Sequence, residues 1–148
     1  MRYQWLGCLL LLAASCGPRT VNLEDFEKKD VKLPNGQIVR AEVMIKLFDL
    51  QRGMMFRESL PQGHGLLFVH PKPGLYPYFM YQVNVPLDII WMDANRRIVE
   101  IVPDAQPCHT RASLCPTYGG KQEASFVLEL GAGEARRYGL QTGNTLTF

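Results

Sequence analysis

Asp88 is the most informative single residue in this sequence. It lies within the apolar run 85–92, where an inward-facing carboxylate without a partner would be costly. Beside the guanidinium of Arg57, such a carboxylate could bind a ligand or transfer protons. Alternatively, Asp88 faces outward or accepts backbone N–H bonds near the start of its strand, and Arg57 is an exposed charge at the end of a helix. The structural interpretation is favoured for both residues.

The remaining polar residues do not form a recognisable catalytic or metal-binding motif. The three histidines, His64, His70 and His109, lack the spacing of a helical zinc motif. No serine occupies a nucleophile elbow. We therefore predict no metal, no cofactor and no catalytic set of residues. An enzyme that uses Asp88 and Arg57 as acid and base groups is kept as the alternative.

Cys108 and Cys115 are the two cysteines that follow Cys16, and six residues separate them. An even number of cysteines in an exported protein predicts a disulfide. Closing so short a loop would stabilise the fold by about 2.5 kcal/mol if the effect is the chain entropy of the unfolded state. A metal site that includes His109 would have three ligands where structural zinc usually has four. The disulfide is therefore preferred over a metal site or free thiols.

The N-terminus has the three parts of an export signal: a basic start at Arg2, an apolar stretch, and small residues before Cys16. The apolar stretch, residues 5–15, would be about 16 Å long as a helix, which is too short to span a hydrocarbon core of about 30 Å. Residues 13–16, Ala-Ala-Ser-Cys, resemble the lipobox of bacterial lipoproteins, whose cysteine is acylated and becomes the new N-terminus. We predict a signal peptide over 1–15, lipidation at Cys16 and a polar tether over 16–30. Plain secretion and a retained anchor are the alternatives.

The predicted lipid group defines where we expect the protein to be. It would hold the chain in a bacterial membrane, facing the periplasm or the cell surface. Position 17 is Gly rather than the Asp that resembles an inner-membrane retention signal. In a cell with two membranes, the outer membrane is therefore favoured.

The composition is that of a globular protein, with 47% hydrophobic and 20% charged residues. This excludes collagen-like, coiled-coil and wholly disordered chains. The formal net charge is +2 and no cluster of Lys and Arg stands out, so nucleic-acid binding lacks its usual electrostatic support. A chain of 148 residues suits one domain, which we place at 31–148 and expect to be a monomer.

Short apolar runs separated by Gly and Pro predict a mainly β (α+β) domain. Candidate strands lie at 37–45, 65–70, 76–81, 87–92, 98–102 and 124–130, with hairpin turns at 34–36 and 93–97 and a last strand ending at Phe148. Short helices are predicted for a turn that ends at Gly53 and for 132–138. The pattern favours a compact antiparallel sheet in a β-barrel-like or sandwich domain.

Four separated blocks occur in an order and spacing typical of one known family: Arg-Gly-Met-Met-Phe-Arg-Glu-Ser-Leu at 52–60, Gly-Leu-Leu-Phe at 65–68, Tyr-Phe-Met-Tyr-Gln-Val-Asn-Val-Pro-Leu-Asp at 78–88 and Val-Leu-Glu-Leu-Gly-Ala-Gly at 127–133. In these blocks the chain resembles the domain-of-unknown-function 192 family (uncharacterised protein family 0127), over roughly 31–148. The resemblance implies a compact β-rich domain found mainly in exported bacterial and archaeal proteins. It implies no activity, because none is established for the family.

The chain departs from this family just before Pro86. Where the family typically reads Phe-Trp-Met-Lys-Asn-Thr, this chain has Tyr-Phe-Met-Tyr-Gln-Val at 78–83. If the family's polar side chains bind a common ligand there, this chain has lost or changed it. The resemblance thus makes Met80, Tyr81 and Gln82 candidate ligand-binding residues.

Together these features favour a membrane-anchored envelope lipoprotein with a small β-rich binding domain. Its ligand would be a partner protein, an envelope polymer or a small molecule. Outward-facing tyrosines near Pro73 and Pro77 could stack on sugars or peptides, although core packing explains them almost as well. A small extracytoplasmic enzyme and a purely structural envelope protein are the alternatives.

Overall fold

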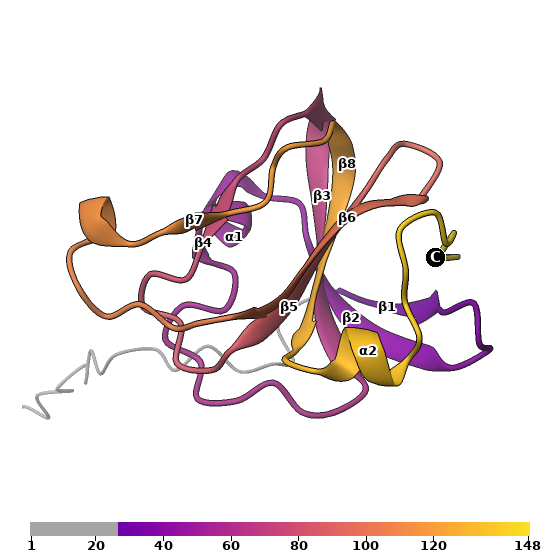
Figure 1. The fold of residues 1–148 in the computed structure, drawn as a ribbon, viewed down its shortest axis with the longest axis horizontal. Coiled ribbons are helices and arrows are strands. Elements are labelled where there is room, and N and C mark those ends of the chain that lie inside the picture. The colour runs from indigo at the N-terminus through magenta and orange to yellow at the C-terminus, as the bar shows by residue number, and fades with distance from the viewer. Residues whose placement is uncertain (1–26) are drawn as a thin grey trace, which may run out of the picture.

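The computed structural model describes residues 27–148, which form a mainly β fold with two short α-helices (Figure 1). The predicted signal peptide, Cys16 and most of the predicted tether lie outside these residues. The elements, in chain order, are β1 (Lys28–Lys32), β2 (Ile38–Met44), α1 (Leu47–Arg52), β3 (His64–Gly74), β4 (Tyr78–Phe79), β5 (Leu87–Met92), β6 (Ile98–Ala105), the 3₁₀ turn η1 (Ala112–Leu114), β7 (Thr117–Tyr118), β8 (Ala124–Gly131) and α2 (Glu134–Arg137).

Six strands form one sheet in the order β1-β2-β3-β8-β5-β6, and β4 and β7 form a separate two-stranded ribbon. All six residues of β5 are buried, because this strand lies inside the sheet and both of its faces are covered. β1 and β6 lie at the edges. Strand pairing begins at Lys28, within the segment predicted as the end of the tether.

The β2–β3 pair is parallel, whereas the other pairs in the sheet are antiparallel. The expected mainly β, mostly antiparallel sheet is therefore confirmed, with β2–β3 as its parallel pair. A parallel pair needs a crossover connection rather than a tight hairpin. The crossover here is the segment 45–63, which contains α1.

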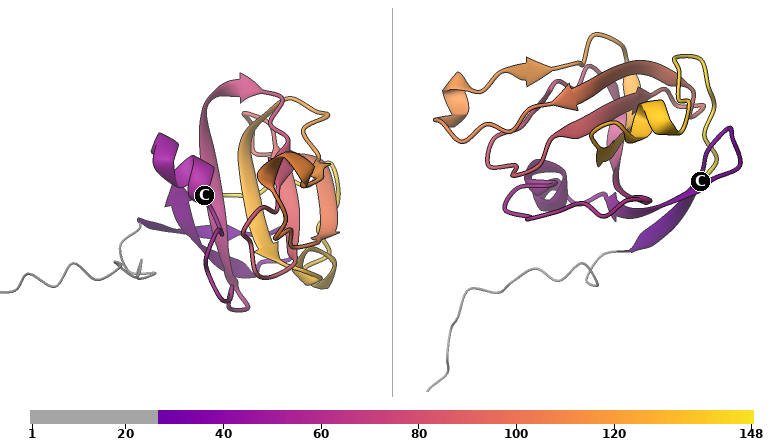
Figure 2. Two further views of the ribbon diagram at one scale, coloured as in Figure 1. Left: turned by 90° about the vertical axis from the view of Figure 1, so that its left-hand side faces the viewer. Right: turned by 60° about the horizontal axis from the view of Figure 1, so that its bottom comes forward.

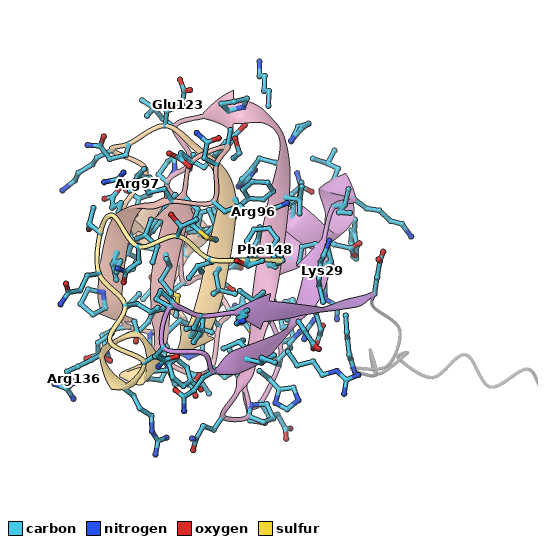
Figure 3. All side chains as sticks on the ribbon, turned by 90° about the vertical axis from the view of Figure 1, so that its right-hand side faces the viewer. Lys29, Arg96, Arg97, Glu123, Arg136 and Phe148 are labelled. Carbon is cyan, nitrogen blue, oxygen red and sulfur yellow. A yellow bond between two sulfur atoms is a disulfide. The ribbon has the colours of Figure 1, made fainter. Side chains whose placement is uncertain are left out.

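The sheet does not close into a barrel within the described residues. The C-terminal segment instead runs between the two edges and makes isolated bridges, Lys32 to Thr147 on one side and Arg97 to Thr145 on the other. The predicted last strand is therefore absent as a strand. Figure 3 shows Phe148 lying across the sheet beside Arg96, whose guanidinium lies 4.8 Å from the centre of the Phe148 ring.

Two hydrophobic clusters lie on opposite faces of the sheet, because side chains alternate between the faces along each strand. Ile90 and Leu128 face the first cluster, which packs against α2 and the C-terminal segment. Ile89 and Val127 face the second cluster, which packs against the segment around α1. Figure 2 shows α1 and α2 on opposite sides of the twisted sheet.

The predicted helices and hairpins are mostly confirmed. α1 ends at Gly53, α2 lies within 132–138, and β1–β2 and β5–β6 are hairpins at the predicted turns. Among the described residues, the core begins at Val31 and ends at Leu146. The segment 27–148 thus contains a complete core and folds as a unit.

Candidate ligand-binding pocket

A pocket of about 770 Å³ opens on the face of the sheet that carries α1. Small-molecule sites usually have volumes of about 300–1,000 Å³. The pocket is bounded by α1 and the segment after it, by β3 and β8, and by residues 76–83. Its lining is mostly apolar, with aromatic side chains from several elements: Phe48, Phe56, Phe68, Tyr76, Tyr78 and Tyr81.

The crossover between β2 and β3 builds one wall of this pocket. Gly53 ends α1 with a φ of 44°, a left-handed value that favours glycine. A Cβ at this position would lie 3.0 Å from the Phe68 ring. Glycine therefore lets the crossover pack directly on β3, and the next residues, Met54 to Phe56, follow along the pocket.

Two residues with left-handed backbones are joined at this wall. Phe56 has a φ of 63° and Gln82 a φ of 56°, and the Phe56 N–H donates a 2.9 Å hydrogen bond to the Gln82 carbonyl. Such conformations are strained for residues other than glycine, and they concentrate at functional sites. The bond ties the crossover to the segment that follows β4.

Trp91 supports the opposite wall from below. Its Nε1 donates a 2.8 Å hydrogen bond to the Tyr76 carbonyl, and its ring packs edge-to-face against Tyr78. Gly119, with a φ of 58°, lies over the same ring, where any Cβ would overlap it. The β4–β7 ribbon is thus seated on a fully buried side chain.

The loop between β6 and β7 is closed by a disulfide between Cys108 and Cys115, as the cysteine count predicts. Ala112, inside this loop, contributes to the pocket lining. The Cys108 N–H donates to the Met80 carbonyl, and the Gln82 N–H donates to the Cys108 carbonyl. The disulfide loop is therefore fixed to the residues around β4.

Two glutamates lie in one row on the pocket face of the sheet. Glu42 of β2 pairs with Leu66 of β3, and Leu66 pairs in turn with Glu129 of β8. Residues in register share a face, and strands are spaced about 4.8 Å apart, so the two glutamate backbones are about 10 Å apart. Both side chains are buried.

Arg57 supplies a guanidinium to this row. Its Nη1 donates a 3.0 Å hydrogen bond to Oε1 of Glu42, and its Nη2 lies 2.9 Å from Oε2 of the same residue. The Arg57 carbonyl also accepts a hydrogen bond from the Asn84 side chain. One guanidinium thus pairs with the Glu42 carboxylate and interacts electrostatically with Glu129.

Glu129 is a carboxyl group in a strongly perturbed environment. Burial raises its pKa from 4.5 to about 8, although the nearby Arg57 guanidinium opposes the rise. Its Oε2 is buried and accepts no hydrogen bond from residues 27–148. A fully buried carboxyl oxygen without a donor is rare in proteins and calls for an explanation.

His70 and Tyr78 form a second polar pair at the pocket. The His70 Nε2 lies 3.1 Å from the Tyr78 hydroxyl, and the His70 ring stacks on Tyr76 with ring centres 3.6 Å apart. Burial lowers the pKa of His70. Burial, together with Glu129 and Tyr76, raises the pKa of Tyr78 well above its ordinary value. Both side chains are therefore neutral at pH 7.

Large apolar side chains are exposed around the pocket mouth. Phe48 and Phe56 are 66% and 64% exposed, and Phe79 is 39% exposed, and all three line the pocket. Single exposed apolar residues are common, but a group around one opening marks a binding surface.

The structure does not bring Asp88 and Arg57 together. Asp88 pairs with Leu130 and therefore faces the first cluster, away from the pocket. Its Oδ1 accepts a 2.9 Å hydrogen bond from the Asp104 N–H, and its Oδ2 accepts a 2.8 Å bond from the Ala135 N–H at the start of α2. Asp88 therefore accepts backbone N–H bonds near the start of its strand, which is the structural role favoured from the sequence.

The three candidates after β4 have different surroundings. Tyr81 lines the pocket and stacks on Phe79 with ring centres 6.0 Å apart. Met80 is buried in the second cluster, and Gln82 contributes its backbone to the hydrogen bonds described above. Of these residues, Tyr81 presents its side chain to the pocket.

Glu129 and Glu42 were not identified from the sequence. Glu129 lies in the apolar strand Val-Leu-Glu-Leu, and the reasoning that singled out Asp88 applies equally to it. Glu42 alternates with Ala41 and Val43 in β2, which reads as a residue on a solvent-facing side. Nothing in the local pattern reveals that the distant Arg57 covers it.

Within the part of the chain that the structure describes, no three His, Cys, Asp or Glu side chains gather as metal ligands. The same part contains no helix long and apolar enough to cross a membrane.

The fold and the pocket define a mainly β protein with an aromatic pocket and a buried carboxyl on one face of its sheet. The chain belongs to the DUF192 family, described as "Uncharacterized ACR, COG1430", which matches residues 31–148. No curated protein matches the chain.

Two solved structures are similar to this one. A protein of unknown function from Novosphingobium aromaticivorans DSM 12444 superposes with a TM-score of 0.78 at 23% identity, covering 96% of this chain and 100% of that one. A putative transcription regulator from Sinorhizobium meliloti 1021 has a TM-score of 0.73 at 25% identity, covering 82% of this chain and 94% of that one. The first likeness concerns the fold alone.

Proposed function

We propose that this protein is an exported, lipid-anchored envelope protein whose domain binds a small, largely apolar ligand in the pocket. The observation that carries the binding role is the pocket itself, an aromatic cavity of about 770 Å³ with a buried carboxyl and a few other polar groups. Apolar walls with few convergent polar groups and a perturbed pKa are typical of ligand sites. The exposed phenylalanine rings at the pocket mouth support a ligand that comes from an apolar environment.

The export and anchoring rest on the sequence of the N-terminus. The basic start, the short apolar stretch and the Ala-Ala-Ser-Cys motif support cleavage before Cys16 and acylation of that residue. The chain enters the described domain beside β2, since the Val43 N–H donates to the Glu27 carbonyl. Glu27 therefore lies close to the strand end that leads into α1.

Recovery of a ligand tests the binding role. The segment 27–148 is exported in a bacterial host, purified without detergent and examined by native mass spectrometry. A stoichiometric adduct is expected, and Phe48→Ser should weaken its retention because Phe48 lines the mouth. Ile38→Ser is the matched control, since Ile38 is also exposed but lies away from the pocket. An apo mass under all conditions, with no apolar compound bound on titration, would overturn the binding role.

Metabolic labelling tests the anchor separately. Cells that express the full chain are fed an alkyne analogue of palmitate, with and without an inhibitor of the lipoprotein signal peptidase. Label on the wild-type chain, its loss in Cys16→Ser, and accumulation of uncleaved chain with the inhibitor are expected. An unlabelled chain that keeps Met1 would overturn the anchor while leaving the pocket's role intact.

A further inference from the structure

We propose that the ligand of the pocket is an organic cation: a molecule whose apolar body lies among the aromatic side chains and whose ammonium group pairs with the Glu129 carboxylate. This inference rests on the proposed binding function and adds the chemical class of the ligand.

The pocket floor holds two carboxyl groups but one guanidinium. Glu42 and Glu129 are two buried carboxyl groups on one face of the sheet, and Arg57 is the guanidinium that both of them share. Arg57 contacts Glu42 with both terminal nitrogens. One positive charge cannot neutralise two carboxylates, and a buried charge without a partner is strongly unfavourable, so Glu129 stays protonated in the free protein below about pH 8. A ligand that brings a second positive charge would complete the set.

The other polar groups around the pocket do not supply that charge. Arg52 lies on the rim, with its guanidinium 5.9 Å from the centre of the exposed Phe48 ring. His70 contacts the Tyr78 hydroxyl, and burial favours its neutral form. Among residues 27–148, the charged or titratable groups that line the pocket with Glu129 are Arg52, His70, Tyr76, Tyr78 and Tyr81. Arg57 and Tyr78 interact electrostatically with Glu129, and Glu42 lies in the same row of the sheet.

The geometry of Glu129 points the same way. Its side chain lines the pocket, and its buried Oε2 accepts no hydrogen bond from the described part of the chain. An ammonium group has three donors and no acceptor, so it matches an unoccupied carboxylate oxygen. The surrounding aromatic rings favour a cation as well, since their faces are electronegative.

An anionic ligand fits these groups poorly. Arg57 is occupied by Glu42, and an ionised Glu129 would repel a second anion. A neutral alcohol could donate one hydrogen bond to Oε2 but brings no positive charge to favour the ionised form of Glu129. The proposal therefore predicts that a cation binds most tightly, a neutral molecule less tightly and an anion most weakly.

The cation also predicts a pH dependence. Glu129 must ionise to pair with an ammonium group, and burial holds its pKa at about 8 in the free protein. A primary amine stays charged across this range, because its own pKa is near 10. The affinity should therefore rise about tenfold per pH unit between pH 6 and 8 and level off above that, with nearly one proton released on binding at pH 7 and about half a proton at pH 8.

The test compares three probes of equal chain length: decylamine, decanol and decanoate. Each is titrated calorimetrically into the segment 27–148 at pH 8, below its micelle concentration. Decylamine is expected to bind at least tenfold more tightly than decanol, and decanoate more weakly than both. Two buffers of different ionisation enthalpy give the number of protons released, and this readout uses only the wild-type protein.

Glu129→Gln keeps the shape of the side chain and removes its charge. The decylamine affinity should fall at least tenfold, while the decanol affinity stays within twofold. Glu123→Gln is the matched control, because Glu123 is exposed (Figure 3), does not line the pocket and should change neither affinity.

Equal affinities for decylamine and decanol, or binding without proton release, would overturn the cation and leave an apolar ligand in place. The same holds if Glu129→Gln keeps the preference for decylamine. If none of the three probes binds, and native mass spectrometry finds no adduct, the proposed binding function fails together with this inference.

Discussion

The buried carboxyl of Glu129 should make the stability of the protein fall as the pH rises from acid to neutral. The pKa of Glu129 is about 8 in the folded protein and near 4.5 when the chain is unfolded. Between these values the folded state holds a proton that the unfolded state has released. Unfolding therefore becomes more favourable with increasing pH, and the effect is complete above about pH 8.

The size of this effect follows from the two pKa values. Each pKa unit corresponds to about 1.4 kcal/mol, so the rise from 4.5 to about 8 corresponds to a cost of about 5 kcal/mol for the ionised, ligand-free protein. At pH 5 the cost is below about 1 kcal/mol. A domain of this size has a total stability of about 5–15 kcal/mol, so the change is large enough to measure.

Urea unfolding of the segment 27–148 at pH 5, 6, 7 and 8 measures this directly, with the fluorescence of Trp91 as the signal. The free energy of unfolding of the wild-type protein should fall across the series. Glu129→Gln should be more stable than the wild type at pH 8, with the difference shrinking towards pH 5. Glu123→Gln serves as the control for loss of an exposed carboxyl. A wild-type stability that does not depend on pH, or an equal slope in Glu129→Gln, would refute the reasoning.

Three further predictions concern contacts elsewhere in the fold, each measured as the change in the free energy of urea unfolding. Asp88→Ala should destabilise the domain by about 2–4 kcal/mol, because it leaves two backbone N–H groups without acceptors; unchanged stability would contradict its structural role. Arg57→Ala should cost about 3 kcal/mol by leaving Glu42 buried and unpaired. The double variant with Glu42→Ala should recover part of that loss, and strict additivity would show that the pair is not coupled. Replacing Cys108 and Cys115 with Ser should cost about 2.5 kcal/mol, and a reductant that lowers the wild type to the same value is the control.

Much of the fold could be predicted because it is recorded in local patterns. The β5–β6 hairpin is an example: Asp93 follows an apolar run, and its carboxylate accepts the N–H groups of Asn95 and Arg97 in the turn. The end of α1 at Gly53 and the cysteine pair are equally local. Each of these features depends on a few residues that are close in sequence, so the sequence pattern is enough to predict it.

The parallel β2–β3 pair could not be predicted in this way. β2 and β3 read as ordinary strands, and neither composition nor spacing reveals which strand lies beside another. The C-terminal residues show the same limit, since Thr145 and Thr147 each make one bridge to a different edge of the sheet. Their extended conformation was predicted, but its partners come from residues far away in sequence.

The candidate site shows the same limit. Glu129 could have been found, because a carboxylate inside an apolar strand is a signal within the sequence. Its relation to Arg57 could not, because the two residues come from segments that meet only when the crossover folds over the sheet. Asp88 carries the same signal as Glu129 but faces the other side of the sheet, and a shift of one residue along a strand decides which face a side chain joins.

The crossover at 45–63 gives the protein an adaptable part that is separate from its scaffold. The strands beneath it are held by hydrogen bonds and by packing on both faces, whereas the crossover meets the sheet mainly through side chains. Insertions and substitutions in such a connection are tolerated more easily than changes within the strands. If the proposed binding function holds, we expect relatives with the same sheet to differ in their ligands through this connection, and grafting it from one relative to another would test that expectation.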